Sequence, residues 1–439
     1  MIPIRPKLSP AKPTLPAPTL PSQWRARWLL AAPHRLAFFA AALMLGGSAL
    51  WWTAIVLLQN HLTVPWAIAP TLAHSLWMLF GFMPLFFSGF LFTAGPKWLS
   101  MPEVSAHSIR PPVLLCVCGW LLFVAGAHFS ASLNVLGLAL VTIGWSRLTT
   151  QFIRLLRRSR AKDKVHATCI AAACGLGAVL MAGVVLCLYL QHYQAVRAVV
   201  QVALWAFVGV VYVAVAHRMI PFFTSNALPL LDAWRPQWLL WLLIGVMTLE
   251  GVMGAAEIWI WPLPAGLRVA QTLVEVAAAS LLLWLAIRWG LLKSLKVRLL
   301  AMLHLGFVWL GLTLLLLALS HSLELASAGT LTLGLAPTHA FTMGFLTSLL
   351  VAMATRVSSG HSGRSLAADD LVWAMYWTLQ LAVVLRLLVA IATAFGASGS
   401  SWVHSILSAS ALAWLVAVGA WAVRYGNWFG RPRVDGRPG

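Results

Sequence analysis

Six ionisable or metal-binding side chains stand inside long apolar stretches of the sequence. They are His74, Glu250, Glu275, His304, His339 and Arg386. Burying such a group in hydrocarbon costs several kcal/mol unless it is paired, protonated or bound to a ligand. These residues are therefore the first candidates for chemistry in this chain.

The spacing of two histidines predicts a shared depth. His74 follows Pro70 by about one helical turn, and His339 follows Pro337, so both are expected near the same membrane surface. Neutral imidazole binds both haem iron and copper, so the two suit an axial haem pair or part of a copper site. The alternative is that each is an interfacial histidine that only hydrogen-bonds.

The other four candidates lie elsewhere. His304 is about six residues from Arg298, near the opposite surface, and suits a second cofactor, a proton route or a structural hydrogen bond. Glu250, Glu275 and Arg386 are expected to partner one another, or a carboxyl group could be protonated in a proton path. No two histidines have the i, i+4 spacing of zinc-protease and di-iron motifs.

The elements that must position these residues are apolar runs of membrane-spanning length. The 439 residues are 61% hydrophobic and 9% charged, whereas soluble proteins are about 25% charged. We therefore expect an all-α, polytopic membrane bundle of about 12 transmembrane helices. The expected spans, with the third and fourth the shortest, are Leu36–Leu58, Pro70–Ala94, Pro112–Ala127, Ser130–Trp145, Ala167–Leu190, Val196–Ala216, Trp238–Trp259, Leu267–Ile287, Leu299–Ser320, Leu331–Ala354, Leu371–Phe395 and Trp402–Val423.

The net charge of +20 is distributed unequally over the two ends of these spans. Of the 30 Lys and Arg residues, all but three fall on the side of the two termini; Arg197 and Arg268 are on the other side, and Arg386 is inside a span. The positive-inside rule then places both termini in the cytoplasm. Contact with anionic lipid headgroups accounts for the charge, and no nucleic-acid partner is expected.

The domain organisation follows from the same pattern. Residues 1–35 are expected to form a Pro-rich basic cytoplasmic tail, 36–423 the twelve-span membrane domain and 424–439 a second basic cytoplasmic tail. The five cysteines are expected to pack as small apolar residues. The absence of a Walker loop and of a Cys-x-x-Cys-His motif argues against ATP-driven transport and covalent haem.

Two basic segments at the predicted cytoplasmic surface have the composition of anion-binding loops. One is His217–Thr224, and the other is Thr355–Arg364, which contains Arg356, His361 and Arg364. Such loops can cradle a phosphate or a haem propionate. The alternative is a pair of solvated loops with ordinary turn residues.

In their order and spacing, several segments together resemble the NnrS family. The matching blocks are His74–Gly81, Phe90–Trp98, Arg218–Thr224, Leu303–Leu310, His339–Ala340, Thr355–Ser358 and Gly360–Arg364. The resemblance implies a twelve-span haem- and copper-containing protein of the bacterial inner membrane that limits nitrosative stress. It also places His74, His304 and His339 on family histidines.

One block departs from the family pattern. Leu76 and Trp77 stand where the family usually has a second histidine and a glutamate, which weakens the expectation of copper more than that of haem. By analogy of topology alone, haem-copper oxidases also hold a haem between histidines of spans 2 and 10. His74 and His339 occupy the equivalent spans.

We therefore expect an NnrS-like inner-membrane protein with a non-covalent haem, and copper as a further cofactor. The expected metal ligands are His74, His339 and His304; Arg356, His361 and Arg364 are expected to contact the anion. The protein would protect against nitric oxide, with nitric oxide or nitrosyl complexes as partners, through redox chemistry or sensing. The alternatives are a transporter or channel with a polar path near Glu250, Glu275 and Arg386, or a cofactor-free assembly scaffold.

Overall fold

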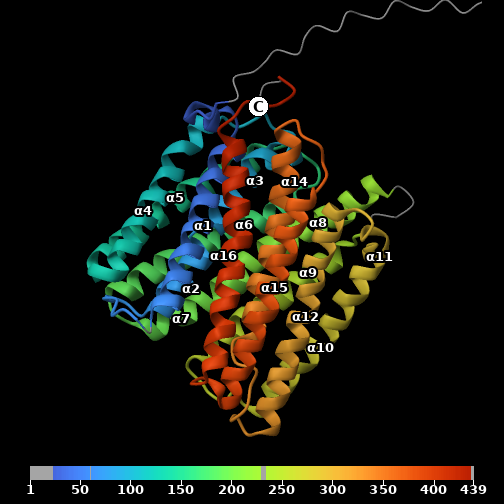
Figure 1. Cartoon of the computed structure of the whole chain (residues 1–439). Helices are drawn as coiled ribbons and strands as arrows, with labels where there is room; N and C mark the ends of the chain where they lie inside the picture. Colours follow the sequence, from blue (N-terminus) through green and yellow to red (C-terminus); the bar gives the residue numbers. More distant parts are fainter. Residues whose placement is uncertain (1–22, 60, 229–233, 437–439) are drawn as a thin grey trace, which may run out of the picture.

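A computed structural model of the chain describes residues 23–59, 61–228 and 234–436, and these residues form helices without any β-strand. Twelve of the described helical segments are long and apolar enough to cross a membrane, and they run side by side in one bundle (Figure 1). The predicted all-α, twelve-span architecture of a multi-pass membrane protein is confirmed.

Eight spans are single helices. They are α1 (Pro33–Leu58), α4 (Ala106–Phe129), α5 (Ala131–Arg158), α6 (Val165–Tyr189), α9 (Gln237–Glu257), α10 (Ala265–Arg288), α12 (Arg298–Ala326) and α16 (Ser401–Phe429). Each carries an almost continuous apolar sequence, which hydrocarbon favours as a helix because all backbone hydrogen bonds are then made within the segment.

Four spans are interrupted or change their helical pitch. They are α2 (Pro70–Phe80) with α3 (Met83–Trp98); α7 (Tyr193–Val202), the π-helical η2 (Ala203–Gly209) and α8 (Val210–Ala227); α13 (Ala336–His339), the π-helical η3 (Ala340–Thr347) and α14 (Ser348–His361); and α15 (Asp370–Ala392) with the π-helical η4 (Thr393–Ala397). The short η1 (Ala26–Ala31) and α11 (Leu291–Ser294) are too short to span a membrane. Prolines begin α2 and α13, where the fixed φ angle and missing N–H suit the first helical turn.

The predicted break between the third and fourth spans is present, at Ser130, but the prediction that these two spans are short is wrong. The helix α4 starts at Ala106, and α5 continues to Arg158. These helices run past their apolar cores because the backbone stays helical at arginine residues, whose long side chains carry their charged ends to the aqueous surface. The helices α1 and α16 likewise extend beyond the predicted domain limits, and residues 1–22 and 437–439 of the two tails lie outside the described part.

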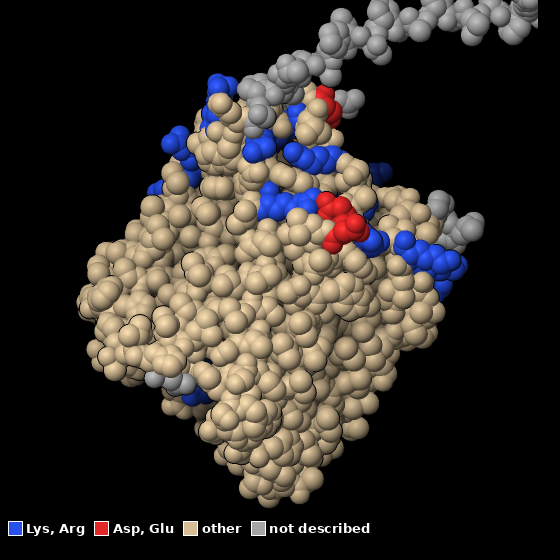
Figure 2. All heavy atoms as spheres, in the orientation of Figure 1, with Lys and Arg blue, Asp and Glu red and all other residues tan. Residues whose placement is uncertain are grey.

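The first and last spans lie side by side, so the described chain begins and ends at the same end of the bundle (Figure 1). Most Lys and Arg residues on the face shown in Figure 2 gather at that end. We call it the basic end; it carries Arg35, Arg158, Arg364 and Arg433. The loops after α1 and α9 lie at the opposite end.

Glycines bring α4 and α5 into backbone contact. A Cβ atom at Gly137 would lie 2.4 Å from the Phe123 nitrogen and 2.6 Å from the Gly119 oxygen, and one at Gly126 would lie 2.2 Å from the Asn134 nitrogen. These neighbours are backbone atoms, which cannot rotate away. Small residues are the usual means by which membrane helices pack closely.

Replacing Gly137 by alanine is expected to lower the free energy of unfolding by roughly 1–3 kcal/mol, because the added methyl group collides with the α4 backbone. Thermal unfolding of the detergent-solubilised protein measures this change. Gly175→Ala in α6 is the matched control, since open space surrounds Gly175 and alanine has the higher helix propensity. Equal melting temperatures for the two variants would contradict the backbone contact.

Candidate functional site

Three predicted residues come together in the half of the bundle away from the basic end. His74 lies on α2, His339 ends α13, and Arg386 lies on α15, which packs against α13. The His339 ring is within electrostatic reach of both His74 and Arg386, and Arg386 also acts on His74. Spans 2, 10 and 11 therefore converge on one site, the His–Arg cluster (His74, His339 and Arg386).

Each imidazole of the cluster has an uncommitted nitrogen. His339 Nδ1 lies 2.9 Å from the Leu335 carbonyl oxygen; because a carbonyl only accepts, Nδ1 carries the proton and Nε2 has a free lone pair. The His74 ring stacks on Trp52 of α1 with centroids 3.9 Å apart, and its Nδ1 is buried without a hydrogen-bond partner. Metal-binding histidines commonly donate their other N–H to a carbonyl, as His339 does.

Arg386 is the only charged member of the cluster. Its half-buried guanidinium makes no hydrogen bond or ion pair with any residue that the structure describes. An arginine remains charged in proteins, and an uncompensated charge inside an apolar bundle is costly. The cluster therefore combines two available imidazoles with a cation that lacks an anionic partner.

The prediction that Arg386 partners Glu250 and Glu275 is wrong. Both carboxyl groups belong to a separate set on α9, α10 and α12, which we call the polar network. Its members are Glu250, Glu257, Arg268, Gln271, Glu275, His321 and Glu324. The sequence shows which spans contain charged residues, but it does not show which spans pack against each other.

Arg268 is the centre of the polar network. It is fully buried in α10, although its position near the end of the predicted span Leu267–Ile287 counted it among the basic residues of the surface opposite the termini. Its Nη1 donates to Glu257 and to Gln271 at 2.7 Å each, and its Nε lies 3.0 Å from Glu324 Oε2. The signal missed in the sequence is that Arg268, Gln271 and Glu275 recur at helical spacing and share one face of α10.

The family assignment rests on nearly the whole bundle. The model of the NnrS protein family matches residues 28–433, a range that includes every span and the complete His–Arg cluster. The chain belongs to the NnrS family. No curated protein matches it.

In this NnrS protein, Leu76 and Trp77 follow His74 on α2. Both are buried, and Trp77 packs between Trp51, with centroids 5.4 Å apart, and the parallel ring of Trp120. The described residues contain no group of three or more His, Cys, Asp or Glu side chains that could hold a metal ion. This part of α2 thus contributes packing and one histidine, His74.

His304 lies apart from the His–Arg cluster, in the half near the basic end. Its Nε2 is 2.9 Å from the Thr224 hydroxyl, which itself donates to the Ile220 carbonyl at 2.9 Å. The hydroxyl proton is already used, so the Nε2–H of His304 donates to Thr224. His304 Nδ1 is left buried without a partner.

The predicted anion-contacting residues do not form one site. The Arg356 guanidinium lies 4.1 Å from the Phe223 ring of α8, whereas the His361 ring lies 4.5 Å from that of His34 on α1. Arg364 instead stacks on α16. Arg356 and His361 are five residues apart, which turns their side chains to different faces of α14, and Arg364 lies in the loop that follows the helix.

Arg364 lies in positive surroundings. Its guanidinium lies 4.2 Å from the Trp428 ring, and its Nη1 is buried without a partner. Burial first, and then the positive charges of Arg431 and Arg424, lower the pKa of Arg364. An anion near this side chain would relieve that repulsion.

Sequence reasoning also missed a histidine pair near the basic end. His166 Nε2 lies 3.0 Å from His217 Nδ1, and His217 Nε2 lies 3.1 Å from the Pro236 carbonyl oxygen. The carbonyl fixes the proton on His217 Nε2, so His166 donates to His217 Nδ1. His166 begins α6, where no local pattern distinguishes it from an ordinary surface histidine.

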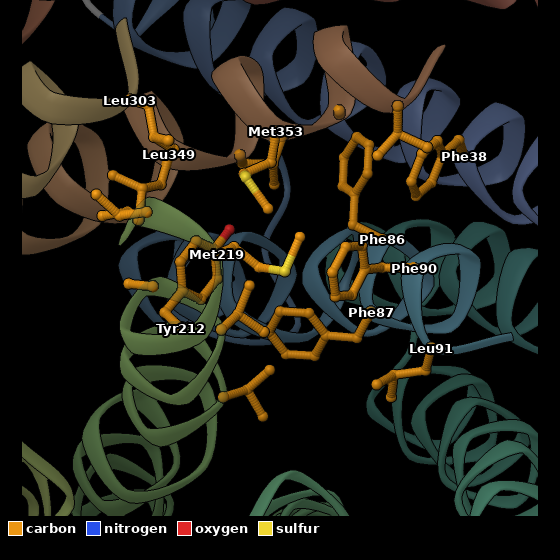
Figure 3. Close-up of a pocket in the computed structure, with 17 residues that line it drawn as sticks. Phe38, Phe86, Phe87, Phe90, Leu91, Tyr212, Met219, Leu303, Leu349 and Met353 are labelled. Carbon is orange, nitrogen blue, oxygen red and sulfur yellow. The ribbon is translucent and has the colours of Figure 1, made fainter. Parts of the chain in front are cut away.

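An apolar cavity lies among α1, α3, α8, α12 and α14 (Figure 3). Its volume is about 70 Å³, and its lining includes Phe86, Met219 and Met353. One water molecule takes up about 30 Å³ in the liquid, so the cavity is far smaller than a haem. The Tyr212 hydroxyl at its wall already donates to Met83 Sδ at 3.2 Å. Its lining contains no His, Cys, Asp or Glu side chain among the described residues.

Arg268→Met is expected to lower the free energy of unfolding by roughly 3–5 kcal/mol, because it leaves Glu257 and Glu324 without their cation inside the bundle. Thermal unfolding in detergent provides the measurement. The matched control is Arg197→Met on α7, whose side chain is exposed; we expect a change within about 0.5 kcal/mol. A variant as stable as the control would show that the ion pairs of Arg268 contribute nothing.

Proposed function

We propose that this NnrS protein holds a non-covalent haem in the His–Arg cluster, with His74 and His339 as iron ligands and Arg386 as the partner of a propionate. The observation that carries the proposal is the unpaired Arg386 beside two imidazoles with free nitrogens. A ligand that contains a metal and carries negative charge would satisfy all three. Haem meets both requirements.

Several features of the chain support this assignment. The Leu335 carbonyl fixes the tautomer of His339, and the stack on Trp52 orients the His74 ring. Haem would supply a redox-active iron. Two histidine ligands leave no open position on that iron, which favours electron transfer or redox sensing over direct gas binding.

The biological role in the proposal is protection against nitric oxide and nitrosative stress, as the family resemblance implies. We place the protein in the bacterial inner membrane with the basic end in the cytoplasm, following the positive-inside rule. His304 is the second candidate ligand through its free Nδ1, and Arg356, His361 and Arg364 are separate anion contacts. Copper is not part of the proposal, because the buried Trp77 stands where the family resemblance implies a glutamate.

His74→Ala and His339→Ala are each expected to alter the reduced-minus-oxidised visible spectrum and to lower the iron content of the purified protein. Arg386→Met is expected to reduce haem retention several-fold because the propionate loses its cation, whereas Arg386→Lys retains part of it. His192→Ala, in an exposed position before α7, is the control and should leave the spectrum unchanged. A folded, colourless and iron-free wild-type protein would refute the proposal.

The number of histidines that bind the proposed haem iron can be tested separately. With both histidines on the iron, carbon monoxide should not change the spectrum of the reduced wild-type protein; in His339→Ala it should, because one position is then open. A change of equal size in the wild type would show that one of the two histidines is not a ligand.

A further inference from the structure

The polar network contains more acidic groups than basic ones. Four carboxyl groups, one arginine and one histidine meet within α9, α10 and α12. The acidic members are Glu250, Glu257, Glu275 and Glu324, and the basic members are Arg268 and His321. Full ionisation would leave at least two net negative charges in the bundle, which low-dielectric surroundings oppose.

The excess acid is concentrated in one pair. Arg268 is engaged by Glu257 and Glu324, so it leaves Glu250 and Glu275 without a direct cationic contact from an arginine. These two are 3% and 0% exposed. Their carboxyl groups lie within hydrogen-bonding reach of each other.

The donors around the two carboxyl groups are unequal. Glu250 Oε2 accepts from Gln271 Nε2 at 3.0 Å, whereas Glu250 Oε1 is buried without a partner. Glu275 accepts from His321, whose Nδ1 lies 2.9 Å from Oε1 and 3.0 Å from Oε2. An ionised carboxylate only accepts, so these two groups can bond to each other only if one is protonated.

We propose that Glu250 and Glu275 form a buried proton-binding site, which exchanges its proton with the aqueous phase at the opposite end of the bundle through His321. The site lies outside the His–Arg cluster and does not depend on the proposed haem. Its ligand is a single proton held between two carboxyl groups.

His321 connects the pair with the surface. Its Nδ1 lies 2.9 Å from Glu275 Oε1, and its Nε2 lies 3.7 Å from Glu257 Oε1, a gap that a water molecule can bridge. Glu257 ends α9, and its side chain is 25% exposed. It is therefore the aqueous end of the route.

Proton transfer along this route balances without another reactant. His321 Nε2 forms an N–H bond with a proton from Glu257 or its water, while the Nδ1–H bond breaks and that proton passes to Glu275. The imidazole ends neutral with its proton on the other nitrogen. Rotation of the ring or the reverse transfer restores the first tautomer.

Other elements packed against α9, α10 and α12 contribute no described contact to the pair. Their titratable and charged side chains are Tyr193 and Arg197 on α7, Tyr212, His217 and Arg218 on α8, Lys293 on α11, His339 on α13, and Arg356 and His361 on α14. None of these forms a described hydrogen bond or ion pair with a network residue. The protonation of the pair is therefore governed by the network itself.

Infrared spectroscopy of the purified protein tests the proposal. At neutral pH the wild type should show the carbonyl band of a protonated carboxylic acid, and the band should shift on transfer to D₂O. Glu250→Gln and Glu275→Gln, which replace a protonated carboxyl group by a neutral group of similar shape, should each remove it. Glu103→Gln, at an exposed loop position, is the control and should leave it unchanged.

The outcomes separate the alternatives. Absence of the band from the wild type, or its persistence in both variants, would overturn the proposal; the wild-type measurement requires no substitution. A band that Na⁺ alters at fixed pH would also overturn it, by assigning a monovalent cation to these oxygens. His321→Phe should slow the D₂O shift at least tenfold, and an unchanged rate would refute the route. None of these results tests haem binding.

Discussion

A charge inside hydrocarbon requires a partner. Two arginines of this bundle, Arg268 and Arg386, differ in whether the described residues supply one. Arg268 is surrounded by acceptors from Glu257, Gln271 and Glu324, so its charge is compensated within the protein. Arg386 has no described acceptor and lies beside two histidines instead. The same physical rule thus makes the first arginine a structural centre, and it is the reason why we propose a ligand beside the second.

The π-helical segments relate these two regions in space. η3 begins directly after His339, and its Phe341 stacks on Trp205 of η2 with ring centroids 3.9 Å apart. Trp205 in turn lies against Gly251, next to Glu250 on α9. Segments of this pitch occur often at functional sites because they displace the side chains that follow. One aromatic contact therefore joins the segment that follows His339 to the segment that packs beside Glu250.

The sequence predicts what depends on one segment at a time. Apolar runs give the twelve spans, and the prolines near His74 and His339 give these residues a common depth. It fails where neighbouring spans matter: it pairs Arg386 with the wrong carboxyl groups, and it counts the buried Arg268 among the basic residues of the surface opposite the termini. Helix ends were also misplaced, because arginines of α5 continue the helix beyond its apolar core. Contacts between helices carry information that periodicity and composition do not contain.

The contact between α1 and α16 has a consequence for biosynthesis. Near the basic end, the Arg35 side chain donates to the carbonyl of Arg431, 396 positions later, and the Arg25 amide donates to that of Gly430. Because α1 is synthesised long before α16, the side of α1 that α16 covers has no protein partner until α16 is inserted. Lipid must occupy that seam until then, so truncation before α16 would expose this side of α1 rather than merely shorten the protein.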